Sequence, residues 1–357
     1  LDYLSSLDCD QAQGYYIARP MRGDDVDDWF QKRELQRELA RVQALKDIGV
    51  LDTDPESRFD VITQLARKLL KAPVSFISLV DENRQWFKSA NGINFTETPR
   101  DESFCSLAIQ SDGLFVVEDA LDIPLLADNP LVIREPGIRS YAGIPLIIDG
   151  GHAVGALCVC DTEPRRYSER EKQILEELAR LAQRELRTRV EKPPLQSSPF
   201  VDGLSKQEFR GLAETIWAVS QNLNLKFSTI SLKIDGLELI NERFGRSEGD
   251  ACLKAMAALV NSFAGQTDLT GRARNTLLTV HMIDCSDEQL EVVAQELQAK
   301  LEDWESHNGA LAEYLKLSHG IYSCLPQDHA NLASVVEHAI RGLERHQTPE
   351  AEVIKVS

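Results

Sequence analysis

The chain has 357 residues, of which 43% are hydrophobic and 27% charged, and its formal net charge is −18 at pH 7. This length and composition favour two folded domains, and the acidic balance disfavours nucleic acid and anionic membrane surfaces as partners. No apolar run reaches the roughly 20 residues that a membrane helix needs, and no secretion leader opens the chain, so we expect a cytoplasmic protein.

Residues 1–31 contain the segment QGYYIARPM followed by the acidic run DDVDDWF. This piece is too short to fold alone. It resembles the C-terminal end of EAL-type cyclic-di-GMP phosphodiesterase domains, in which such a segment closes the barrel. The residues of an EAL catalytic site are absent from it, so the resemblance implies a remnant whose active part is missing here.

Residues 32–190 predict two helices, a mixed sheet and a long exit helix. Apolar residues at helical spacing mark the first two helices, over 33–48 and after LDTDPESRF. The runs SYAGIPLII and AVGALCVCD flank Asp-Gly-Gly, which is a hairpin-turn signal, and Ser168 is placed to cap a helix over 168–191. The remaining predicted elements are strands over 74–81, 85–90 and 114–119 and a short helix over 103–110.

This order of elements resembles a GAF domain of the kind attached to bacterial sensor kinases and cyclic-di-GMP enzymes. The motifs that carry the resemblance are LDTDPESRFDVITQLA, RQWFKSANG, PRDESFCSLAI, DNPLV, IRSYAGIPL and GALCVCDTEPR. The resemblance implies a mixed antiparallel sheet with flanking helices and a sensor of an unknown small molecule or of redox state. The pocket candidates are Phe76, Trp86, Phe104, Cys105, Arg139 and Tyr141.

These pocket candidates have structural alternatives. Aromatic side chains on strands are more often core than ligand platform. Arg139 needs either an anionic ligand or a carboxylate partner, and Asp119 or Asp161 can supply the carboxylate. Cys105 lies near the start of a short helix, where its pKa can be lowered, but a buried structural thiol is the alternative.

The seven cysteines are scattered and form no CxxC pair, so we expect buried, reduced thiols. We expect Cys158 and Cys160 to point to opposite faces of one strand. The histidines are also dispersed, and no metal site is predicted. In the exit helix over 168–191, we expect the first turns to pack on the domain's own sheet and the later turns to form a homodimer seam.

The segment 191–201, with three prolines and two serines, reads as a linker, and residues 202–348 as a second domain followed by a tail over 349–357. Strands alternate with helices in this domain, which favours an α/β sandwich. The predicted helices cover 205–221, 236–242, 251–263, 287–304 and 331–346. The predicted strands are 227–235, a hairpin over 269–283, and 315–323.

The frame KID…INERFG…GDACL, with DLTGRARNTLLTV and LSHGIY, resembles a GGDEF domain, the fold of diguanylate cyclases. The resemblance implies that Asn241 and Asp250 read guanine, so residual GTP or GDP binding is one interpretation. An amide and a carboxylate together satisfy a guanine edge. Asn241 and Asp250 are also ordinary residue types for a turn and a helix N-cap, so both interpretations stay open.

The catalytic half of the implied site departs from the family pattern. The metal-binding aspartate falls at Lys233, which can instead touch a phosphate, and the phosphate-supporting lysines fall at Glu238 and Glu344. The product-inhibition motif Arg-x-x-Asp keeps Asp268 but has Gly265 in place of its arginine. The signature Gly-Gly-Asp-Glu-Phe falls at Arg274, Asn275, Thr276, Leu277 and Leu278.

The sequence therefore predicts a dimeric, non-catalytic regulator of cyclic-di-GMP signalling, with a GAF sensor and a degenerate GGDEF domain that binds GTP without cyclising it. EAL or other proteins of that pathway are the expected partners. The alternatives are an active diguanylate cyclase with an unusual site and a pure interaction scaffold that binds no ligand.

Overall fold

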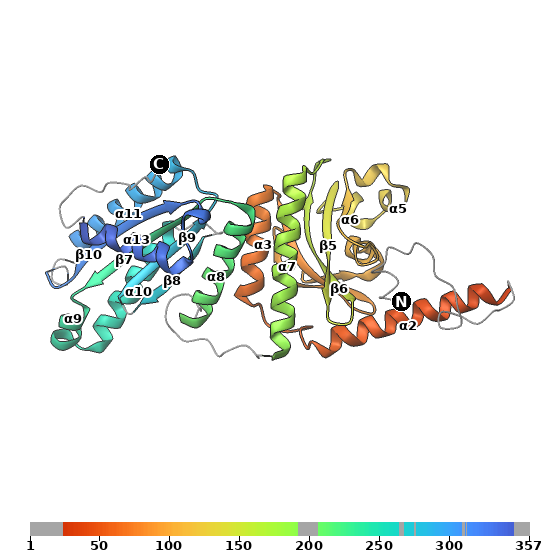
Figure 1. Ribbon diagram of the computed structural model, residues 1–357, viewed down its shortest axis with the longest axis horizontal. Coiled ribbons are helices and arrows are strands. Elements are labelled where there is room, and N and C mark those ends of the chain that lie inside the picture. Colours follow the sequence, from red (N-terminus) through yellow and green to blue (C-terminus); the bar gives the residue numbers. More distant parts are fainter. Residues whose placement is uncertain are drawn as a thin grey trace.

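The computed structural model shows two domains, each built on one antiparallel sheet with helices on its faces (Figure 1). The residues that the structure describes are 24–191, 206–263, 268–274, 276–308, 311 and 313–345. The predicted EAL remnant up to residue 23, the predicted linker after residue 191 and the predicted tail lie outside the described residues. The mixed α/β fold class predicted from the sequence is confirmed.

The sheet of the first domain has six strands in the order β3-β2-β1-β6-β5-β4. Its described neighbours all pair antiparallel. The predicted β5–β6 hairpin is confirmed, and the strands predicted over 74–81 and 85–90 pair with each other as the hairpin β1–β2. The strands are β1 (Val74–Val80), β2 (Arg84–Asn91), β3 (Glu97–Pro99), β4 (Phe115–Val117), β5 (Ser140–Ile148) and β6 (His152–Asp161).

Two long helices, α3 (Ser57–Leu70) and α7 (Glu169–Glu191), cover one face of this sheet, and short helices cover the other. The short elements are η1 (Arg100–Glu102), α4 (Phe104–Ala108), η2 (Ala120–Asp122), α5 (Pro124–Ala127) and α6 (Pro130–Ile133). The predicted cap of α7 is present, because Ser168 Oγ accepts a hydrogen bond from the Glu171 backbone N–H. None of the described helices combines the length and apolar character that a bilayer-spanning segment requires.

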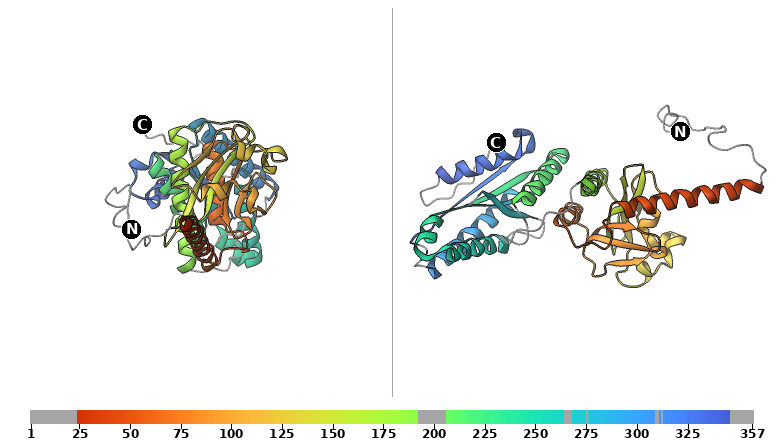
Figure 2. Two further views of the ribbon diagram at one scale, coloured as in Figure 1. Left: turned by 90° about the vertical axis from the view of Figure 1, so that its right-hand side faces the viewer. Right: turned by 90° about the horizontal axis from the view of Figure 1, so that it is seen from below.

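Helix α2 (Asp24–Asp47) is longer than the predicted helix over 33–48. Its last turns pack on the first domain through Val42 and Leu45, which are buried. Leu35 and Leu39 lie on the predicted apolar face but are each 59% exposed. The first turns of α2 project away from the domain (Figure 2), so the domain covers only part of the predicted apolar face.

The second domain has a four-stranded antiparallel sheet in the order β10-β7-β9-β8. Helices α8 (Lys206–Leu223) and α13 (Leu332–Arg345) pack on one face. The other face is covered by α9 (Leu237–Phe244), α10 (Arg246–Phe263) and α11 (Asp287–His307). The strands are β7 (Phe227–Asp235), β8 (Leu269–Arg274), β9 (Leu277–Ile283) and β10 (Lys316–Cys324), and η3 spans Pro326–Asp328.

The start of α10 corrects the sequence prediction. The helix begins at Arg246, five residues before the predicted start, so Asp250 lies inside the helix and is not its N-cap. Gly245, with a φ of 95°, lets the chain turn within one residue from the end of α9 into α10. The loop predicted between the two helices is therefore mostly helical.

The two domains pack against each other through α8, which lies against α3 and α7 (Figure 1). Buried apolar residues of both domains form one continuous cluster across this junction. Polar contacts add to it: Lys68 pairs with Asp268 at 3.3 Å, and Arg184 donates to Thr215 at 3.1 Å. Arg170 also donates to the carbonyl of Leu223.

The apolar stripe of α7 packs inside the chain. Its buried members run from Ile174 to Leu186, which is completely buried. They lie against α3, β5, β6 and α8. Within the described side chains, this stripe offers no exposed apolar seam before residue 188, so it does not support the predicted dimer contact there. A homodimer as such stays a prediction.

Candidate functional site

The turn between β8 and β9 lies beside the end of β7 in the second domain. Lys233 of β7 pairs in register with Leu277 of β9, and the Ile234 backbone N–H donates to the Thr276 carbonyl at 2.8 Å. Lys233 Nζ lies 3.1 Å from Asp235 Oδ2, and both side chains are about two-fifths exposed. The end of β7 and the hairpin turn thus form one small, partly solvated site.

The side chains around this turn are poor ligands for a divalent cation. Leu277 and Leu278 are buried and aliphatic. Magnesium prefers carboxylate and water oxygens, whereas Lys233 holds its ammonium against Asp235, the nearby carboxylate. Among the described residues, no group of three or more His, Cys, Asp or Glu side chains is arranged to hold a metal ion.

Asn241 of α9 and Asp250 of α10 lie on the same side of the sheet. The Asn241 side chain lies against Gly249: a Cβ on that glycine would lie 2.0 Å from Asn241 Oδ1. Asp250 follows Gly249 directly and is exposed, while Asn241 is half-buried. The glycine therefore allows the close approach of α9 and α10 that brings the Asn241 amide next to the residue preceding Asp250.

In the first domain, four of the six pocket candidates form one buried cluster: Phe76, Phe104, Cys105 and Tyr141. The rings of Phe104 and Tyr141 stack with centroids 5.3 Å apart. Cys105 Sγ lies 3.2 Å from the Tyr141 hydroxyl. These four side chains pack against one another between α4 and the sheet. The residues chosen from the pocket motifs therefore belong to one buried cluster.

The other two candidates lie elsewhere. Trp86 belongs to the cluster on the opposite face of the sheet. Arg139 forms a two-pronged ion pair with Asp119, with Nε–Oδ1 and NH2–Oδ2 distances of 2.8 and 2.6 Å. This pairing lowers the pKa of Asp119. Asp119 is thus the carboxylate partner that Arg139 was expected to need in the absence of an anionic ligand.

Two thiols and a phenol meet in the buried cluster. Cys105 Sγ lies 3.2 Å from Cys158 Sγ, and the Tyr141 hydroxyl lies 2.9 Å from Cys158 Sγ. Burial raises the pKa of Cys158. Burial also opposes ionisation of Cys105, but hydrogen bonds with Cys158 and Tyr141 lower its pKa. Cys105 is therefore the thiol of this cluster best placed to ionise.

The prediction that Cys158 and Cys160 point to opposite faces of their strand is wrong. Both side chains are buried in the same cluster, on the α4 side of the sheet. Successive residues of a strand alternate between faces, so residues two apart share one face. The cluster therefore contains three thiols, of which Cys105 and Cys158 are in contact.

Comparison with protein families assigns both domains. Residues 54–186 match the GAF domain family, and residues 205–349 match the family described as diguanylate cyclase, GGDEF domain. The chain carries a GAF domain followed by a GGDEF domain. Both matches fall on the two sheet domains that the structure shows.

Two characterised bacterial proteins are similar to this chain. Cyclic di-GMP phosphodiesterase PA2567 of Pseudomonas aeruginosa is 38% identical over 166 residues, which are 46% of this chain and 27% of that protein. Diguanylate cyclase DgcP of Escherichia coli is 24% identical over 233 residues, which are 62% of this chain and 66% of that protein. The chain thus spans about a quarter of the first and two thirds of the second.

Solved structures similar to each domain are known. An active GGEEF domain of a diguanylate cyclase from Vibrio cholerae is 20% identical, with a TM-score of 0.36, and covers 42% of this chain and 97% of that one. The GAF domain of an Acinetobacter phosphoenolpyruvate-protein phosphotransferase is 18% identical, with a TM-score of 0.32, and covers 43% of this chain and 92% of that one.

Asp268, which the GGDEF resemblance places in the product-inhibition motif, takes part in the domain junction. Its side chain is 9% exposed and pairs with Lys68 of α3 in the GAF domain. The motif's arginine position, Gly265, lies outside the described residues, as does Asn275 of the signature loop. Glu238 is exposed on α9, and no side-chain position is described for Glu344.

Sequence reasoning missed a buried ion pair in the GAF domain. The Lys88 side chain is completely buried, with Nζ 2.7 Å from Glu56 Oε1. Nζ also donates to Thr53 Oγ1 and to the Asp54 carbonyl at 2.8 and 2.7 Å. Burial, together with the charge of nearby Arg58, lowers the pKa of Lys88 to about 8. The available signal was a lysine inside the strand QWFKSA, since a buried charge requires partners.

Asp235 was also missed as a site residue. It stands two residues after Lys233 on the same strand, so both side chains lie on one face at the strand end. This spacing places the two opposite charges on one face, where they lie 3.1 Å apart. In the GGDEF domain, Asp235 and Lys233 therefore act as one neutralised pair beside the hairpin turn.

Proposed function

We propose that this chain is a non-catalytic regulator in cyclic-di-GMP signalling. In this proposal the GAF domain senses a small molecule or redox state, and the GGDEF domain binds GTP or GDP without cyclising it. The names of the two characterised relatives, a cyclic di-GMP phosphodiesterase and a diguanylate cyclase, support this signalling context. Partners from the same pathway and a homodimer belong to the proposal.

The observation that carries the proposal is the Lys233–Asp235 pair beside the hairpin turn. The GGDEF resemblance places a metal carboxylate at Lys233 and another at Thr276. Phosphoryl transfer depends on divalent metal to neutralise developing charge, and losing one placed electrostatic stabiliser costs about 10²–10³ in rate. A lysine at this position repels a cation, so we expect cyclase turnover to be lost.

The neighbouring residues support nucleotide binding without metal. The Asn241 side chain of α9 lies against Gly249 of α10, and Asp250 follows that glycine directly and is exposed, so both residue types remain available on this side of the sheet. Lys233 is partly exposed, and an exposed ion pair such as Lys233–Asp235 contributes about 0–1 kcal/mol. Exchanging Asp235 for a ligand phosphate therefore costs Lys233 little.

The first experiment measures turnover. Purified protein is incubated with GTP and Mg²⁺, and cyclic-di-GMP is quantified by chromatography, with an active diguanylate cyclase as the positive control. We expect no product above background. Formation of cyclic-di-GMP would refute the proposal and establish the alternative, an active cyclase with an unusual site.

The second experiment measures binding. Calorimetric titration with GTP is performed on the wild-type chain and on Asn241→Ala and Asp250→Ala, with and without Mg²⁺. We expect binding by the wild type that does not require Mg²⁺ and is weakened at least tenfold in both variants. Absence of heat in every sample would favour the third interpretation, a scaffold without a ligand in this domain.

A further inference from the structure

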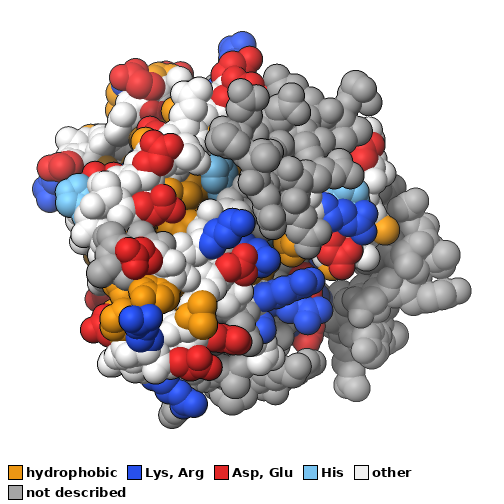
Figure 3. Space-filling view, turned by 90° about the vertical axis from the view of Figure 1, so that its left-hand side faces the viewer, with side chains coloured by type: hydrophobic (Ala, Val, Ile, Leu, Met, Phe, Trp, Pro, Cys, Tyr) orange, Lys and Arg blue, Asp and Glu red, His pale blue; other side chains and the backbone are white. Residues whose placement is uncertain are grey.

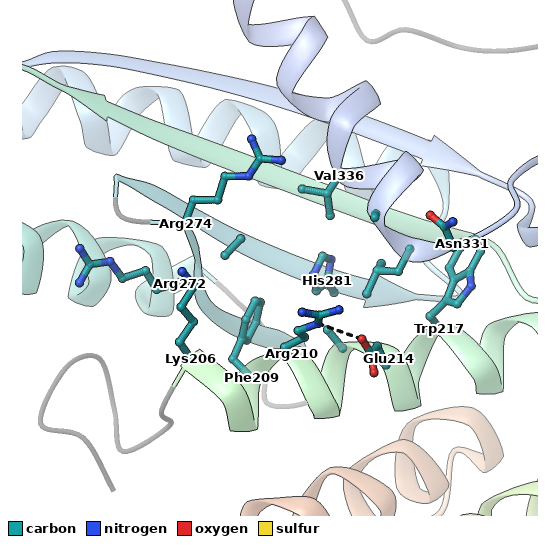
Figure 4. Close-up of a pocket in the computed structure, with 14 residues that line it drawn as sticks. Lys206, Phe209, Arg210, Glu214, Trp217, Arg272, Arg274, His281, Asn331 and Val336 are labelled. Carbon is teal, nitrogen blue, oxygen red and sulfur yellow. Dashed lines mark hydrogen bonds and ion pairs between the residues drawn. The ribbon is translucent and has the colours of Figure 1, made fainter.

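A large pocket opens between α8, α13 and the β8–β9 edge of the sheet, on the face opposite to α9 and α10 (Figure 4). Its volume is about 650 Å³, which lies within the range of sites for small organic ligands. Asn241 and Asp250 lie on the α9–α10 side, so this pocket is separate from the proposed nucleotide site. Helix α8 lines it with Lys206, Phe209 and Trp217, β9 with His281, β8 with Arg274, and α13 with Ala333.

The floor of the pocket is aromatic. Phe209 of α8 and His281 of β9 lie almost parallel, with ring centroids 5.6 Å apart and planes 12° apart. Trp217 lies about two turns further along the same face of α8, and all three side chains are more than nine-tenths buried. Thr229 Oγ1 lies 2.9 Å from His281 Nδ1. Burial lowers the pKa of His281 to about 4, so the ring is neutral at pH 7.

The rim of the pocket is cationic. Lys206 and Arg210 come from α8, and Arg272 and Arg274 come from β8. Figure 4 shows Lys206, Arg272 and Arg274 at one end of the pocket and Trp217 at the other. The only carboxylate among the described lining residues is on α8, and it pairs with Arg210 at 3.0 Å.

This concentration of cations is unusual for the chain as a whole. The lining contains four Lys or Arg side chains and one Glu, whereas the chain carries a formal charge of −18. Figure 3 shows Lys and Arg side chains gathered next to hydrophobic ones on this end of the molecule. A local positive field beside an apolar cavity attracts anions that also carry apolar surface.

We propose that this pocket binds an aromatic anion: a small molecule with one or two fused rings and a phosphate or a similar acidic group. The ring lies against the Phe209–His281 floor, where offset stacking adds to apolar burial. The acidic group faces Arg274 and Lys206, since a guanidinium group binds phosphate oxygens in pairs. The aromatic floor does not account for the cationic rim, and the rim does not account for the floor, so the proposed ligand carries both a ring and an acidic group.

The test measures binding of the probe 1-naphthyl phosphate to the full chain, by calorimetry and by quenching of tryptophan fluorescence. Two matched ligands separate its halves: 1-naphthol has the ring without the charge, and inorganic phosphate has the charge without the ring. We expect saturable 1:1 binding of 1-naphthyl phosphate with a Kd of about 100 μM or below. Each half-ligand should bind at least tenfold more weakly.

Three variants locate the binding site. Arg274→Glu reverses an exposed charge at the rim, and Ala333→Trp adds bulk at an exposed lining position. Both should weaken 1-naphthyl phosphate binding at least tenfold. Lys254→Glu, an equal charge reversal at an exposed position on α10 across the sheet, is the matched control and should change the affinity less than twofold.

A competition arm distinguishes two sources of such ligands. If GMP displaces 1-naphthyl phosphate, the natural ligand class includes nucleotides; if it does not, simple aromatic acids are the class. Both outcomes support the pocket, and neither depends on GTP binding near Asn241, which Asn241→Ala removes. Failure of 1-naphthyl phosphate to bind, or binding that Arg274→Glu and Ala333→Trp leave unchanged, overturns the proposal.

Discussion

His281 should make the stability of the GGDEF domain fall as the pH is lowered from 6.5 towards 4. The ring is buried on β9 against Phe209 and Phe227, with Thr229 at Nδ1. Burial lowers its pKa in the folded chain to about 4, from an ordinary value of 6.5. Between these two values the unfolded chain binds a proton at this residue that the folded chain does not, so acid favours unfolding.

The size of this effect follows from the two pKa values. A difference of 2.5 between 6.5 and about 4 corresponds to about 3 kcal/mol once the pH lies below both, at 1.36 kcal/mol per unit. At pH 4.5 most of this, roughly 2.5 kcal/mol, is already lost. At pH 7 the folded and unfolded chains are both neutral at this position, so the loss there is close to zero.

Urea denaturation at pH 7, 6, 5 and 4.5 measures this loss in the wild type and in His281→Gln. Glutamine keeps a hydrogen-bonding group near Thr229 but does not titrate, so the variant keeps only the acid sensitivity that comes from other groups. We expect the free energy of unfolding of the wild type to fall by about 2–3 kcal/mol more than that of the variant between pH 7 and 4.5. Equal losses in both proteins would refute the assignment of a neutral, buried imidazole.

Three further outcomes are expected. Gly249→Ala should weaken GTP binding at least tenfold with little change in the circular dichroism spectrum, because the added Cβ would lie 2.0 Å from Asn241 Oδ1 and displace that amide; unchanged affinity would separate Asn241 from the nucleotide. Lys68→Ala should lower the free energy of unfolding by about 1 kcal/mol, and by less in an Asp268→Ala background, since their 3.3 Å contact joins the domains. If the GAF domain senses redox state, H₂O₂ should join Cys105 and Cys158, whose sulfurs lie 3.2 Å apart, with two thiols and one H₂O₂ giving one disulfide and two waters; mass spectrometry that finds both thiols reduced would exclude this route.

The regular elements were predictable because their signals are local. The hairpins β1–β2, β5–β6 and β8–β9 follow from alternating apolar residues on either side of short turns, and β7 appears at the predicted bounds. The start of α10 was not predicted, because Gly245 at φ 95° leads directly into the helix without a polar cap. The pattern around Asp250 offered a plausible cap five residues too late.

The functional clusters were less predictable because they depend on tertiary packing. Residues near the expected GAF pocket were identified, yet Trp86 lies on the other face of the sheet. The cationic pocket joins α8 to β8 and α13, which are far apart in sequence. Of its arginines, Arg274 was noted only as a departure from a signature loop, and Arg272 was not singled out. No sequence spacing relates them to Phe209 or Trp217.

Helix α8 connects these features physically. One side of it packs on α3 and α7 of the GAF domain, and another lines the pocket through Phe209 and Trp217. Apolar residues of both domains form one continuous buried cluster around it. Closely packed interiors do not deform gradually, so a shift of α7 driven from the GAF domain must move α8 or open the junction. If the GAF domain binds a small molecule as proposed, the reciprocity of coupled binding predicts that an aromatic anion in the pocket changes the affinity for that molecule wherever that molecule changes the affinity for the anion.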